Sequence, residues 1–457
     1  MKPIFIEEKL FLEESLGIKL PDNCWRDGNR IYLNCDSISI VTFTVKNNKI
    51  LLKNNKIIDI KNNIVTIQIR KNKTQDIVNL TWEEEYEKHK VFIENLEKES
   101  IEKTIECIEK FPNYEKRRSD SGGKDSLLTN VIVDKAETKL KLDPLDDMVD
   151  TFNSSNEAPQ TYKQIKKNNV NKKHQFINPK IGWYKWLKDV KKHYIPTVLS
   201  RTCCDQFKHG KLKTILDKNK GYIIFLGMRK YESKKRADYD WYLNEVYEQS
   251  RGQKAAVPKN WVRFLPAVEW HDEFVWLYIL HNKLDFNPLY NLGYERVGCL
   301  ICPNQSDYTD ILTQHYFPLL WKRWMDAVRQ NYIVKNVENR LKWTLEEYQN
   351  GKWKQGVSKE YEIMQLKATP ERVQQLADIK GVSYKIAAKY FNKICACGKK
   401  LNPDEVALFL KLNGRFENTE DSRQYLCKKC TCEKEGWTSK EYQQQVMKFR
   451  NDGCNLF

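Results

Sequence analysis

The hexapeptide Ser121-Gly122-Gly123-Lys124-Asp125-Ser126 is the stretch of this chain whose residue types most directly predict chemistry. Two consecutive glycines let the backbone bend tightly and leave no Cβ in the way of a phosphate oxygen. The apolar residues that follow predict the first turns of a helix, and the amides at a helix N-terminus favour an anion. Lys124 adds a positive charge, and the two serines add hydroxyl donors. The hexapeptide therefore predicts a phosphate-binding loop.

The spacing of this loop differs from the Walker A pattern Gly-x4-Gly-Lys-Ser/Thr, so a P-loop kinase or GTPase is not indicated. The hexapeptide is instead similar to the PP-loop of the adenine-nucleotide alpha hydrolases, and that resemblance implies cleavage of ATP to AMP and pyrophosphate. Ser121, Gly122, Gly123, Lys124 and Ser126 would then hold phosphates. Asp125 would cap the loop or help to position Mg²⁺. A plain glycine turn before a helix is the alternative interpretation.

Two further polar stretches follow predicted strands of the same region. Residues 150–157 leave the end of one strand, where Asn153 is expected to meet the adenosine. Residues 227–236 follow another apolar strand and contain Arg229 and Arg236, whose planar guanidinium groups suit phosphate. Glu232 is expected to hold one of these two arginines in place. For this second stretch, a solvated charged loop is the alternative.

The chain contains 13 cysteines, and ten of them lie after residue 200, which favours metal binding or catalysis over disulfides in an intracellular protein. The adjacent pair Cys203 and Cys204 and the distant pair Cys299 and Cys302 supply four thiolates. That number suits a tetrahedral zinc ion or a cubane iron–sulfur cluster. Adjacent cysteines are awkward around one zinc ion but suit two irons of a cubane. Structural zinc and buried unligated thiols are the alternatives.

Four motifs occur in an order that resembles the phosphoadenosine-phosphosulfate reductase family: SGGKDS, TCCDQFK, GMRKYESKKR and GCLICP. The resemblance covers roughly residues 80–310. It implies a four-iron four-sulfur cluster held by Cys203, Cys204, Cys299 and Cys302, with Lys208 beside the cluster or the substrate.

Two departures distinguish this chain from the sulfonucleotide reductases. Those enzymes usually carry a degenerate PP-loop, whereas this chain keeps the full motif. They also use a nucleophilic cysteine in a C-terminal Glu-Cys-Gly-Leu-His motif. This chain lacks that motif, and Cys454 near its C-terminal end resembles it only weakly. An intact PP-loop beside an iron–sulfur site is closer to ATP-dependent thiolation enzymes, including tRNA thiolases and the DNA phosphorothioation sulfurtransferase. In those enzymes ATP adenylates an oxygen, and sulfur then replaces AMP.

The expected fold class is α/β, with a doubly wound parallel sheet and strands near residues 148–152, 222–226 and 262–268. Residues 114–120 are more charged than a buried central strand should be, so the strand before the PP-loop is expected to be short or nucleotide binding weakened. Thr81 and Glu84 predict a capping box at the start of a helix that runs to Phe111. The expected domains are a small antiparallel β domain (1–75), the catalytic domain (80–310), a helical extension (311–368), a helix-hairpin-helix-like segment (369–392) and a zinc module (393–457).

The last two segments predict contacts with nucleic acid and a metal ion. Residues 379–383 resemble the turn of a helix-hairpin-helix, whose amides contact a nucleic-acid backbone, although Ser383 replaces its second glycine. A plain helical hairpin is the alternative. Paired cysteines separated by about thirty residues predict a zinc site, because a small module gains its stability from the metal. The expected ligands are Cys395, Cys397, Cys427 and Cys430, with Cys432 as a possible substitute.

Composition supports a nucleic-acid partner, since the 457 residues carry a net charge of +17. No apolar run is long enough to span a bilayer and no signal peptide is evident, so we expect a soluble cytoplasmic protein. The leading hypothesis is an ATP-using sulfurtransferase acting on tRNA or DNA with a sulfur donor or a thiol or ferredoxin reductant. A reductase of phosphoadenosine or adenosine phosphosulfate is the second, and a non-catalytic nucleotide- and nucleic-acid-binding protein is the third.

Overall fold

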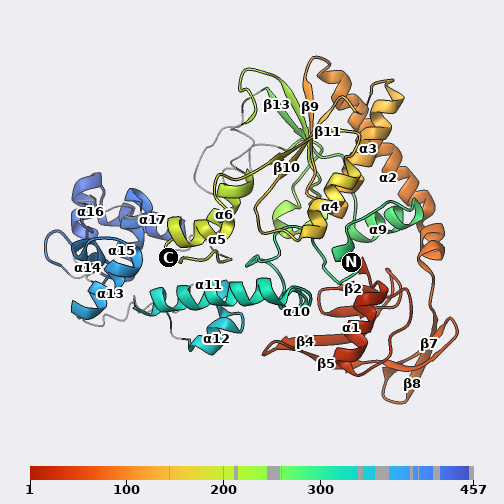
Figure 1. Cartoon of the computed structure of the whole chain (residues 1–457), viewed down its shortest axis with the longest axis horizontal. Coiled ribbons are helices and arrows are strands. Elements are labelled where there is room, and N and C mark those ends of the chain that lie inside the picture. The colour runs from red at the N-terminus through yellow and green to blue at the C-terminus, as the bar shows by residue number, and fades with distance from the viewer. Residues whose placement is uncertain are drawn as a thin grey trace. The chain divides into compact units, whose positions relative to one another are not determined.

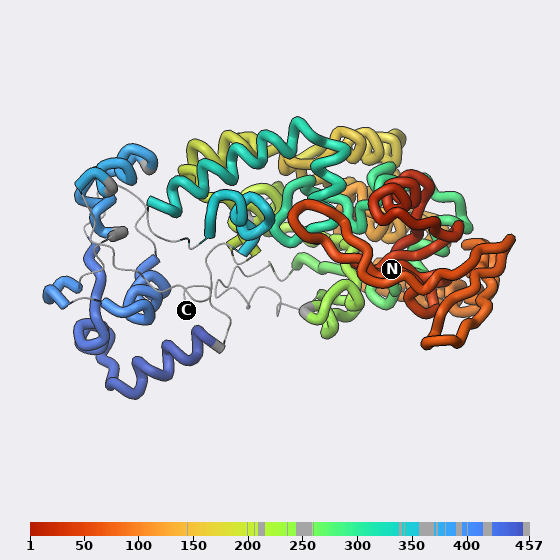
Figure 2. The backbone as a smooth tube through the Cα atoms, turned by 90° about the horizontal axis from the view of Figure 1, so that it is seen from below, coloured from red at the N-terminus to blue at the C-terminus, as the bar shows by residue number. Residues whose placement is uncertain are grey.

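The computed structural model describes residues 1–457 except 144, 199, 210–214, 244–257, 259, 338–340, 342, 356–369, 392–394, 400, 415–422 and 452–457. The chain divides into two compact units. One comprises Met1–Lys180 and Cys203–Leu320, and the other comprises Ile181–Thr202 and Trp321–Phe457. Figure 1 shows the elements of both units, and Figure 2 shows the same backbone from below.

A five-stranded parallel sheet forms the centre of the first unit, as the sequence predicts. Its strands are β9 (Glu115–Ser119), β10 (Met148–Phe152), β11 (Lys173–Ile177), β12 (Tyr222–Phe225) and β13 (Trp261–Phe264). The strand order is β11-β10-β9-β12-β13, with every neighbouring pair parallel. In chain order this is 3-2-1-4-5, the doubly wound arrangement, whose direction reverses between β9 and β12. Ligands of such sheets bind outside the carboxyl ends of the strands at that reversal.

The three strands predicted from apolar runs are present, although β12 and β13 end earlier than expected. Strand β11 was not predicted. Its sequence, Lys-His-Gln-Phe-Ile, is largely polar, and the strand lies at an edge of the sheet, where it pairs only with β10. A strand at an edge needs less apolar character than a central one, so composition alone did not reveal it.

The charged strand β9 lies in the middle of the sheet because its arginines are paired with carboxylates. Arg117 donates from Nε and Nη2 to the two oxygens of Asp150, at 2.9 and 2.8 Å. Arg118, which is fully buried, donates to Asp147 and Glu137, each at 2.6 Å. The charge of the strand is therefore compensated inside the sheet and is not by itself a sign of a weakened nucleotide site.

Helices α2 (Trp82–Lys110), α3 (Lys124–Lys139) and α9 (Asp272–His281) pack together in the first unit (Figure 1). Apolar residues from all three share one core, among them Ile93, Leu128 and Trp276. Helix α2 starts at the predicted capping box: the Thr81 side chain accepts from Glu84 N, and the Glu84 side chain accepts from Thr81 N. Helix α4 (Pro159–Asn168) follows β10.

The N-terminal region contains two antiparallel sheets and one helix, where the sequence predicted a single small sheet (Figures 1 and 2, red). Helix α1 (Ile6–Leu16) was not predicted. Residues of α1 and the first sheet share a core with Tyr308 and Leu312 of α10 (Asp307–Tyr316). The strands are β1 (Lys2–Pro3), β2 (Trp25–Asp27), β3 (Arg30–Tyr32), β4 (Ser39–Lys46), β5 (Lys49–Asn55), β6 (Ile57–Lys61), β7 (Ile64–Arg70) and β8 (Lys73–Val78).

The second unit is helical in its described residues, as predicted for the region after residue 310. Three tryptophans build part of its core, since the Trp324 ring centroid lies 5.3 Å from that of Trp183 and 4.9 Å from that of Trp353. No helix in the described part of the chain has the length and apolar character needed to cross a membrane. The α-helices from Pro318 onward are α11 (Pro318–Val337), α12 (Leu345–Gln349), α13 (Pro370–Lys380), α14 (Tyr384–Phe391), α15 (Pro403–Asn413), α16 (Lys428–Glu435) and α17 (Ser439–Asn451).

Helices α13 and α14 form the hairpin that the sequence predicted, with Gly381 at the turn (blue in Figure 2). Gly381 has φ +62°, a left-handed conformation that glycine adopts without strain. The two ends of the predicted segment, residues 369 and 392, lie outside the described residues.

Candidate functional site

The PP-loop connects the carboxyl end of β9 to the N-terminus of α3, which is where a doubly wound sheet binds its ligand. Asp120 fixes the loop from inside: its Oδ1 accepts from Gly122 N at 2.8 Å and from Ser126 Oγ at 3.1 Å. Its Oδ2 accepts from Asn169 Nδ2 at 2.7 Å. Gly122 has φ +72°, and a Cβ there would lie 2.9 Å from Ile165 Cγ1, so only glycine fits.

Lys124, Asp125, Arg229 and Asp272 form a ring of ion pairs beside this loop. The Lys124 Nζ lies 3.0 Å from both Asp125 Oδ2 and Asp272 Oδ1. Arg229 donates from Nε to Asp125 Oδ1 at 2.7 Å and from Nη2 to Asp272. Its Nη1 donates to the Trp270 carbonyl at 2.8 Å, and the side chain is 1 % exposed. Arg229 is therefore held by the protein at all three nitrogens.

The charges of the ring stabilise one another. Burial alone would raise the pKa of the Asp125 carboxyl, but Lys124 and Arg229 lie against it and lower that pKa below its usual value. The same two cations lower the pKa of Asp272, again against the effect of burial. Two cations and two carboxylates leave the ring without net charge. A polyphosphate that approaches it must either displace a carboxylate or arrive with a divalent cation such as Mg²⁺.

The other residues predicted to contact the nucleotide lie on the two loops that follow β12 and β10. Arg236 forms an ion pair with Glu232, whose other carboxylate oxygen is 4.0 Å from Arg229 Nε. Glu232 thus lies between the two arginines. Asn153 follows β10 and accepts from the Tyr162 hydroxyl at 2.6 Å.

Sequence reasoning missed Asp120, Asp272, Asn287 and Tyr290. Asp272 begins α9, where an acidic residue is ordinarily expected to interact with the helix dipole, so the sequence carried no separate signal of chemistry. Asn287 and Tyr290 lie more than 160 residues after the PP-loop and contact its backbone, with Tyr290 hydroxyl accepting from Lys124 N at 2.9 Å. Only the fold brings them to the loop.

The Cys299–Cys302 segment lies against the loop that follows β10. Glu157 and Cys299 form an isolated antiparallel bridge. Leu300 N donates to the Asn156 carbonyl at 2.6 Å, and Asn156 Nδ2 donates to the Ile301 carbonyl at 2.9 Å. These bonds hold the cysteine pair beside residues that follow β10.

The four predicted cluster ligands lie near one another. Hydrogen bonding to Cys204, burial, and the neighbouring thiols Cys299 and Cys302 raise the pKa of the Cys203 thiol. The Cys299 Sγ lies 3.3 Å from Ser154 Oγ. The negative charge of a Cys299 thiolate raises the pKa of Lys208, so a cation faces this group.

In the described part of the chain, these four thiols do not form a group close enough for a single metal ion. Around one zinc ion with bonds of about 2.3 Å, tetrahedral geometry places the sulfurs about 3.8 Å apart. Within the described ranges, these four cysteines do not provide three sulfurs that all lie within 4.8 Å of one another. The ligands of a cubane bind four different irons and stand further apart. Four soft thiolates with an adjacent cation suit an anionic iron–sulfur cluster.

A second group of four cysteines in the other unit has the tighter spacing. The sulfurs of Cys395, Cys397, Cys427 and Cys430 all lie within 4.8 Å of one another, and Cys397 Sγ is 3.8 Å from Cys427 Sγ. A backbone hydrogen bond from Lys399 and neighbouring thiols lower the pKa of Cys397 to about 7. Cys432, the predicted substitute, is not in this group, and Cys454 lies outside the described residues. This geometry could hold one metal ion.

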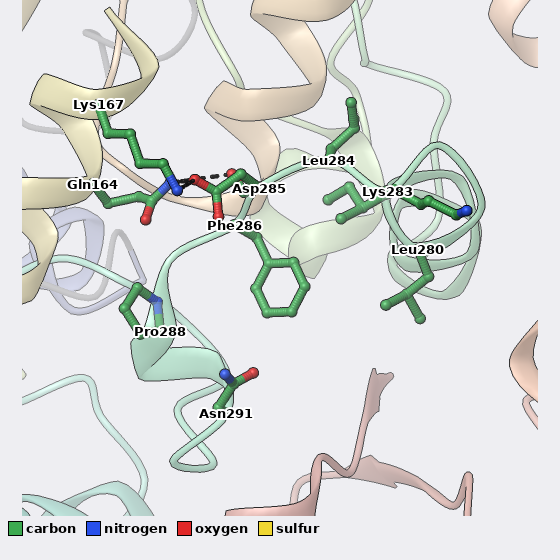
Figure 3. Close-up of a pocket in the computed structure, with 10 residues that line it drawn as sticks. Gln164, Lys167, Leu280, Lys283, Leu284, Asp285, Phe286, Pro288 and Asn291 are labelled. Atoms are coloured by element: carbon green, nitrogen blue, oxygen red, sulfur yellow. Dashed lines mark hydrogen bonds and ion pairs between the residues drawn. The ribbon is translucent and has the colours of Figure 1, made fainter.

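A cavity of about 500 Å³ lies beside the loop that carries Asn287 and Tyr290 (Figure 3). Asp285 joins its two walls, accepting from Gln164 Nε2 at 2.9 Å and pairing with Lys167 Nζ at 2.5 Å. Phe286, Pro288 and other residues of the loop line the same space.

The fold and the loop at its switch point define a PP-loop α/β protein, and comparison with known families gives a more specific class. Residues 118–305 match the phosphoadenosine phosphosulfate reductase domain. Residues 118–305 therefore form a phosphoadenosine phosphosulfate reductase domain, which includes the PP-loop and strands β10 to β13.

The curated relatives extend this match. Two uncharacterized proteins of Methanocaldococcus jannaschii, MJ0973 and MJ0066, are each 29% identical, over 58% and 46% of this chain. The matched regions span 63% and 40% of those two proteins, so less than two thirds of each is covered. An adenosine 5'-phosphosulfate reductase of Salinibacter ruber is 31% identical over 24% of this chain and 38% of its own length.

Two solved structures are also similar at low levels. A phosphoadenylyl-sulfate reductase of Candida auris, in a phosphate complex, has 16% identity and a TM-score of 0.32, covering 45% of this chain and 93% of its own. A U34-tRNA thiolase of Methanococcus maripaludis with its [4Fe-4S] cluster has 12% identity and a TM-score of 0.26, covering 75% of this chain and 93% of its own.

Proposed function

We propose that this protein is a PP-loop enzyme that adenylates an oxygen of its acceptor with ATP and then replaces that oxygen with sulfur. The observation that carries the proposal is the intact SGGKDS loop at the switch point of a doubly wound sheet, with Lys124 and two arginines close by. A protein that only bound a sulfonucleotide would not need a complete pyrophosphate-releasing loop.

In the first step, an acceptor oxygen attacks the α-phosphorus of ATP, and the bond to the bridging oxygen breaks to release pyrophosphate. The amides at the start of α3 face the departing anion, and Lys124 and Arg236 neutralise its charge. Arg229, which is fully engaged by Asp125 and Asp272, positions Lys124 and its carboxylate partners. Asp125 and Asp272 are the carboxylates that could orient Mg²⁺.

In the second step, sulfur from a donor attacks the activated position, and AMP leaves with the acceptor's former oxygen. Cys203, Cys204, Cys299 and Cys302 would hold a four-iron four-sulfur cluster, which when bound would hold or deliver that sulfur. Lys208 would face the negative charge of the cluster, and the Ser154 hydroxyl, which donates to Glu157, would lie beside Cys299.

The proposed acceptor is nucleic acid, either tRNA or DNA. A net charge of +17 favours a polyanion, and the α13–α14 hairpin offers turn amides to a phosphate backbone. Cys395, Cys397, Cys427 and Cys430 would bind a structural zinc ion, because four thiolates at the spacing of one tetrahedron leave no open position for catalysis.

The test is pyrophosphate release from ATP by anaerobically purified protein, measured alone, with bulk tRNA and with DNA. Release that one polymer stimulates supports the adenylation step and identifies the polymer in which to seek sulfur. Lys124→Ala should lower the rate by at least about a hundredfold, because it removes the charge that faces the leaving group. Unchanged turnover in this variant, or no release with either polymer, would refute the proposal.

A second candidate is reduction of a sulfonucleotide, favoured by the 31% identity to an adenosine 5'-phosphosulfate reductase over part of the chain. Arg236 would then bind the phosphosulfate, Arg229 would again position Lys124, and Cys454 would be the candidate nucleophile. This function predicts sulfite release from phosphoadenosine or adenosine phosphosulfate with a thiol donor. Cys454→Ser should abolish that release, and retained activity would exclude Cys454 from it.

A further inference from the structure

The PP-loop depends on other elements for its shape. Two of its residues are glycines, so few side chains of the loop can fix its backbone. Helix α3 also lacks a capping side chain, since its N-cap residue is Gly123. Asp120 bonds one amide of the loop, at Gly122, and leaves the Gly122 carbonyl and the Lys124 amide to be satisfied from elsewhere.

Both of these groups are bonded by one short segment, Asn287 and the helix η5 (Pro288–Tyr290) that follows it. Asn287 Nδ2 donates to the Gly122 carbonyl and to Thr161 Oγ1, each at 3.2 Å. The Tyr290 hydroxyl accepts from Lys124 N at 2.9 Å and so replaces the missing cap of α3.

The segment is itself held rigidly. Asn287 Oδ1 accepts from Leu289 N at 3.0 Å, which uses the other end of the same amide to start η5. Both Asn287 and Tyr290 are 1% exposed. The Tyr290 ring packs edge-on against Trp276, with centroids 4.8 Å apart. Side chains this confined hold the backbone groups that they bond in one position.

We propose that Asn287 and Tyr290 are positioning residues of the PP-loop. They fix the Gly122 carbonyl and the Lys124 amide, and thereby aim the remaining amides of the loop at a diphosphate group. When the amides are already oriented, binding does not have to order the loop, and less conformational entropy is lost. This inference rests on the proposed function in one respect, that the loop binds the pyrophosphate end of a nucleotide.

The test compares Tyr290→Phe with Tyr294→Phe in the full-length protein. Tyr294 is a matched control, because it is also 1% exposed and its hydroxyl bonds Thr313 Oγ1 at 3.0 Å, away from the PP-loop. Each variant keeps its ring and loses one buried hydrogen bond. The readouts are calorimetric binding of inorganic pyrophosphate, hydrogen exchange of the amides in residues 121–126, the KM for ATP, and thermal stability.

Tyr290→Phe should weaken pyrophosphate binding and raise the KM for ATP about tenfold, and should speed exchange at Lys124, because a buried amide loses its acceptor. Tyr294→Phe should lower thermal stability by about as much as Tyr290→Phe does, because each variant loses one buried hydrogen bond. It should leave pyrophosphate binding and the hydrogen exchange of the PP-loop unchanged. Equal binding and equal loop exchange in the two variants would overturn the inference.

Asn287→Ser provides a second variant if Tyr290→Phe does not fold, and it should weaken pyrophosphate binding in the same direction. A wild-type protein that releases no pyrophosphate from ATP would defeat the proposed function, while the binding and exchange measurements would still decide the positioning role. If wild type binds no pyrophosphate, loop exchange alone decides it, and unchanged exchange in both variants counts against the inference.

Discussion

At the scale of single residues, the site is defined by how each charge is neutralised. Lys124 and Arg229 could have faced solvent and an incoming phosphate. Each instead contacts both Asp125 and Asp272, and Asp272 comes from a helix more than 140 residues away in the sequence. A carboxylate that pairs with these cations competes for them with any phosphate that the site binds.

Removing the Asp272 carboxylate should therefore strengthen anion binding. We expect Asp272→Asn to bind inorganic pyrophosphate about fivefold more tightly in the absence of Mg²⁺. The factor is modest because the carboxylate is partly exposed and solvent screens it. The measurement is isothermal titration calorimetry, with Glu273→Gln as the control, since that neighbouring carboxylate faces His271 instead. Weaker binding in Asp272→Asn would mean that Asp272 orients the cations and does not compete with the ligand.

At the scale of secondary-structure elements, strand β9 and helix α2 place charged groups inside the protein and compensate for them differently. In β9 the arginines are paired with carboxylates. In α2, Glu85 is 1% exposed and its Oε1 accepts from Cys35 N at 3.0 Å, whereas its Oε2 has no hydrogen-bond partner among the described residues. These two arrangements lead to opposite predictions for the removal of a charge.

Replacing a buried arginine of β9 should lower the stability of the protein. Arg118→Met leaves Asp147 and Glu137 with Lys116 as a nearby cation, at 3.2 and 3.0 Å. We expect a loss of about 3 kcal/mol in the free energy of unfolding, the size typical of breaking a buried ion pair. Arg70→Met, at an exposed position of β7, should change that free energy by less than about 0.5 kcal/mol. Chemical denaturation measures both, and equal effects would show that the β9 pairs do not stabilise the sheet.

Loss of the Glu85 charge should be stabilising. Burial raises the pKa of Glu85 to about 7 from the usual 4.5, so between these pH values the native state holds a proton that the unfolded chain has lost. The stability of the wild type should therefore fall as pH rises from 4.5 to 7. Glu85→Gln should remove this pH dependence of stability. The variant should be about 2 kcal/mol more stable than the wild type at pH 8. Glu87→Gln, at an exposed position of the same helix, should retain the slope in thermal denaturation across this range.

At the scale of the whole molecule, the two groups of four cysteines are predicted to bind different metals. The sulfurs of the C-terminal group all lie within 4.8 Å of one another, and among the described residues the other group includes no three sulfurs this close. In that other group, Cys299 pairs with Glu157 of the loop that follows β10. The spacing predicts one zinc ion in the C-terminal module and an iron–sulfur cluster in the α/β domain.

The zinc prediction can be tested with a pair of serine substitutions. Cys427→Ser should lower bound zinc from about one ion per chain to near zero and reduce the thermal stability of the C-terminal module, because structural zinc contributes directly to folding. Cys432→Ser should leave the zinc content unchanged, since this thiol is not one of the four grouped C-terminal cysteines. A chromogenic chelator measures the content, and equal zinc loss in both variants would contradict the ligand set.

The prediction of an iron–sulfur cluster can be tested by absorbance spectroscopy. Protein purified without oxygen should show a broad brown absorbance that reductant bleaches, and Cys299→Ser should remove most of it. Cys107→Ser, which changes a buried core thiol of α2, should retain the spectrum. A colourless protein that contains zinc in place of iron would assign a zinc site to these four cysteines.

The sequence by itself determined the features that depend on local chemistry. The PP-loop, the capping box of α2, three strands of the sheet and the C-terminal cysteine spacing are all set by residues close together in the chain, where backbone geometry and side-chain type decide the outcome. It could not determine which distant groups meet. Asp272, Asn287 and Tyr290 reach the PP-loop, and carboxylates reach the arginines of β9, only because parallel strands and packed helices bring remote segments together. Burial makes those contacts strong, and burial is a property of the tertiary structure alone.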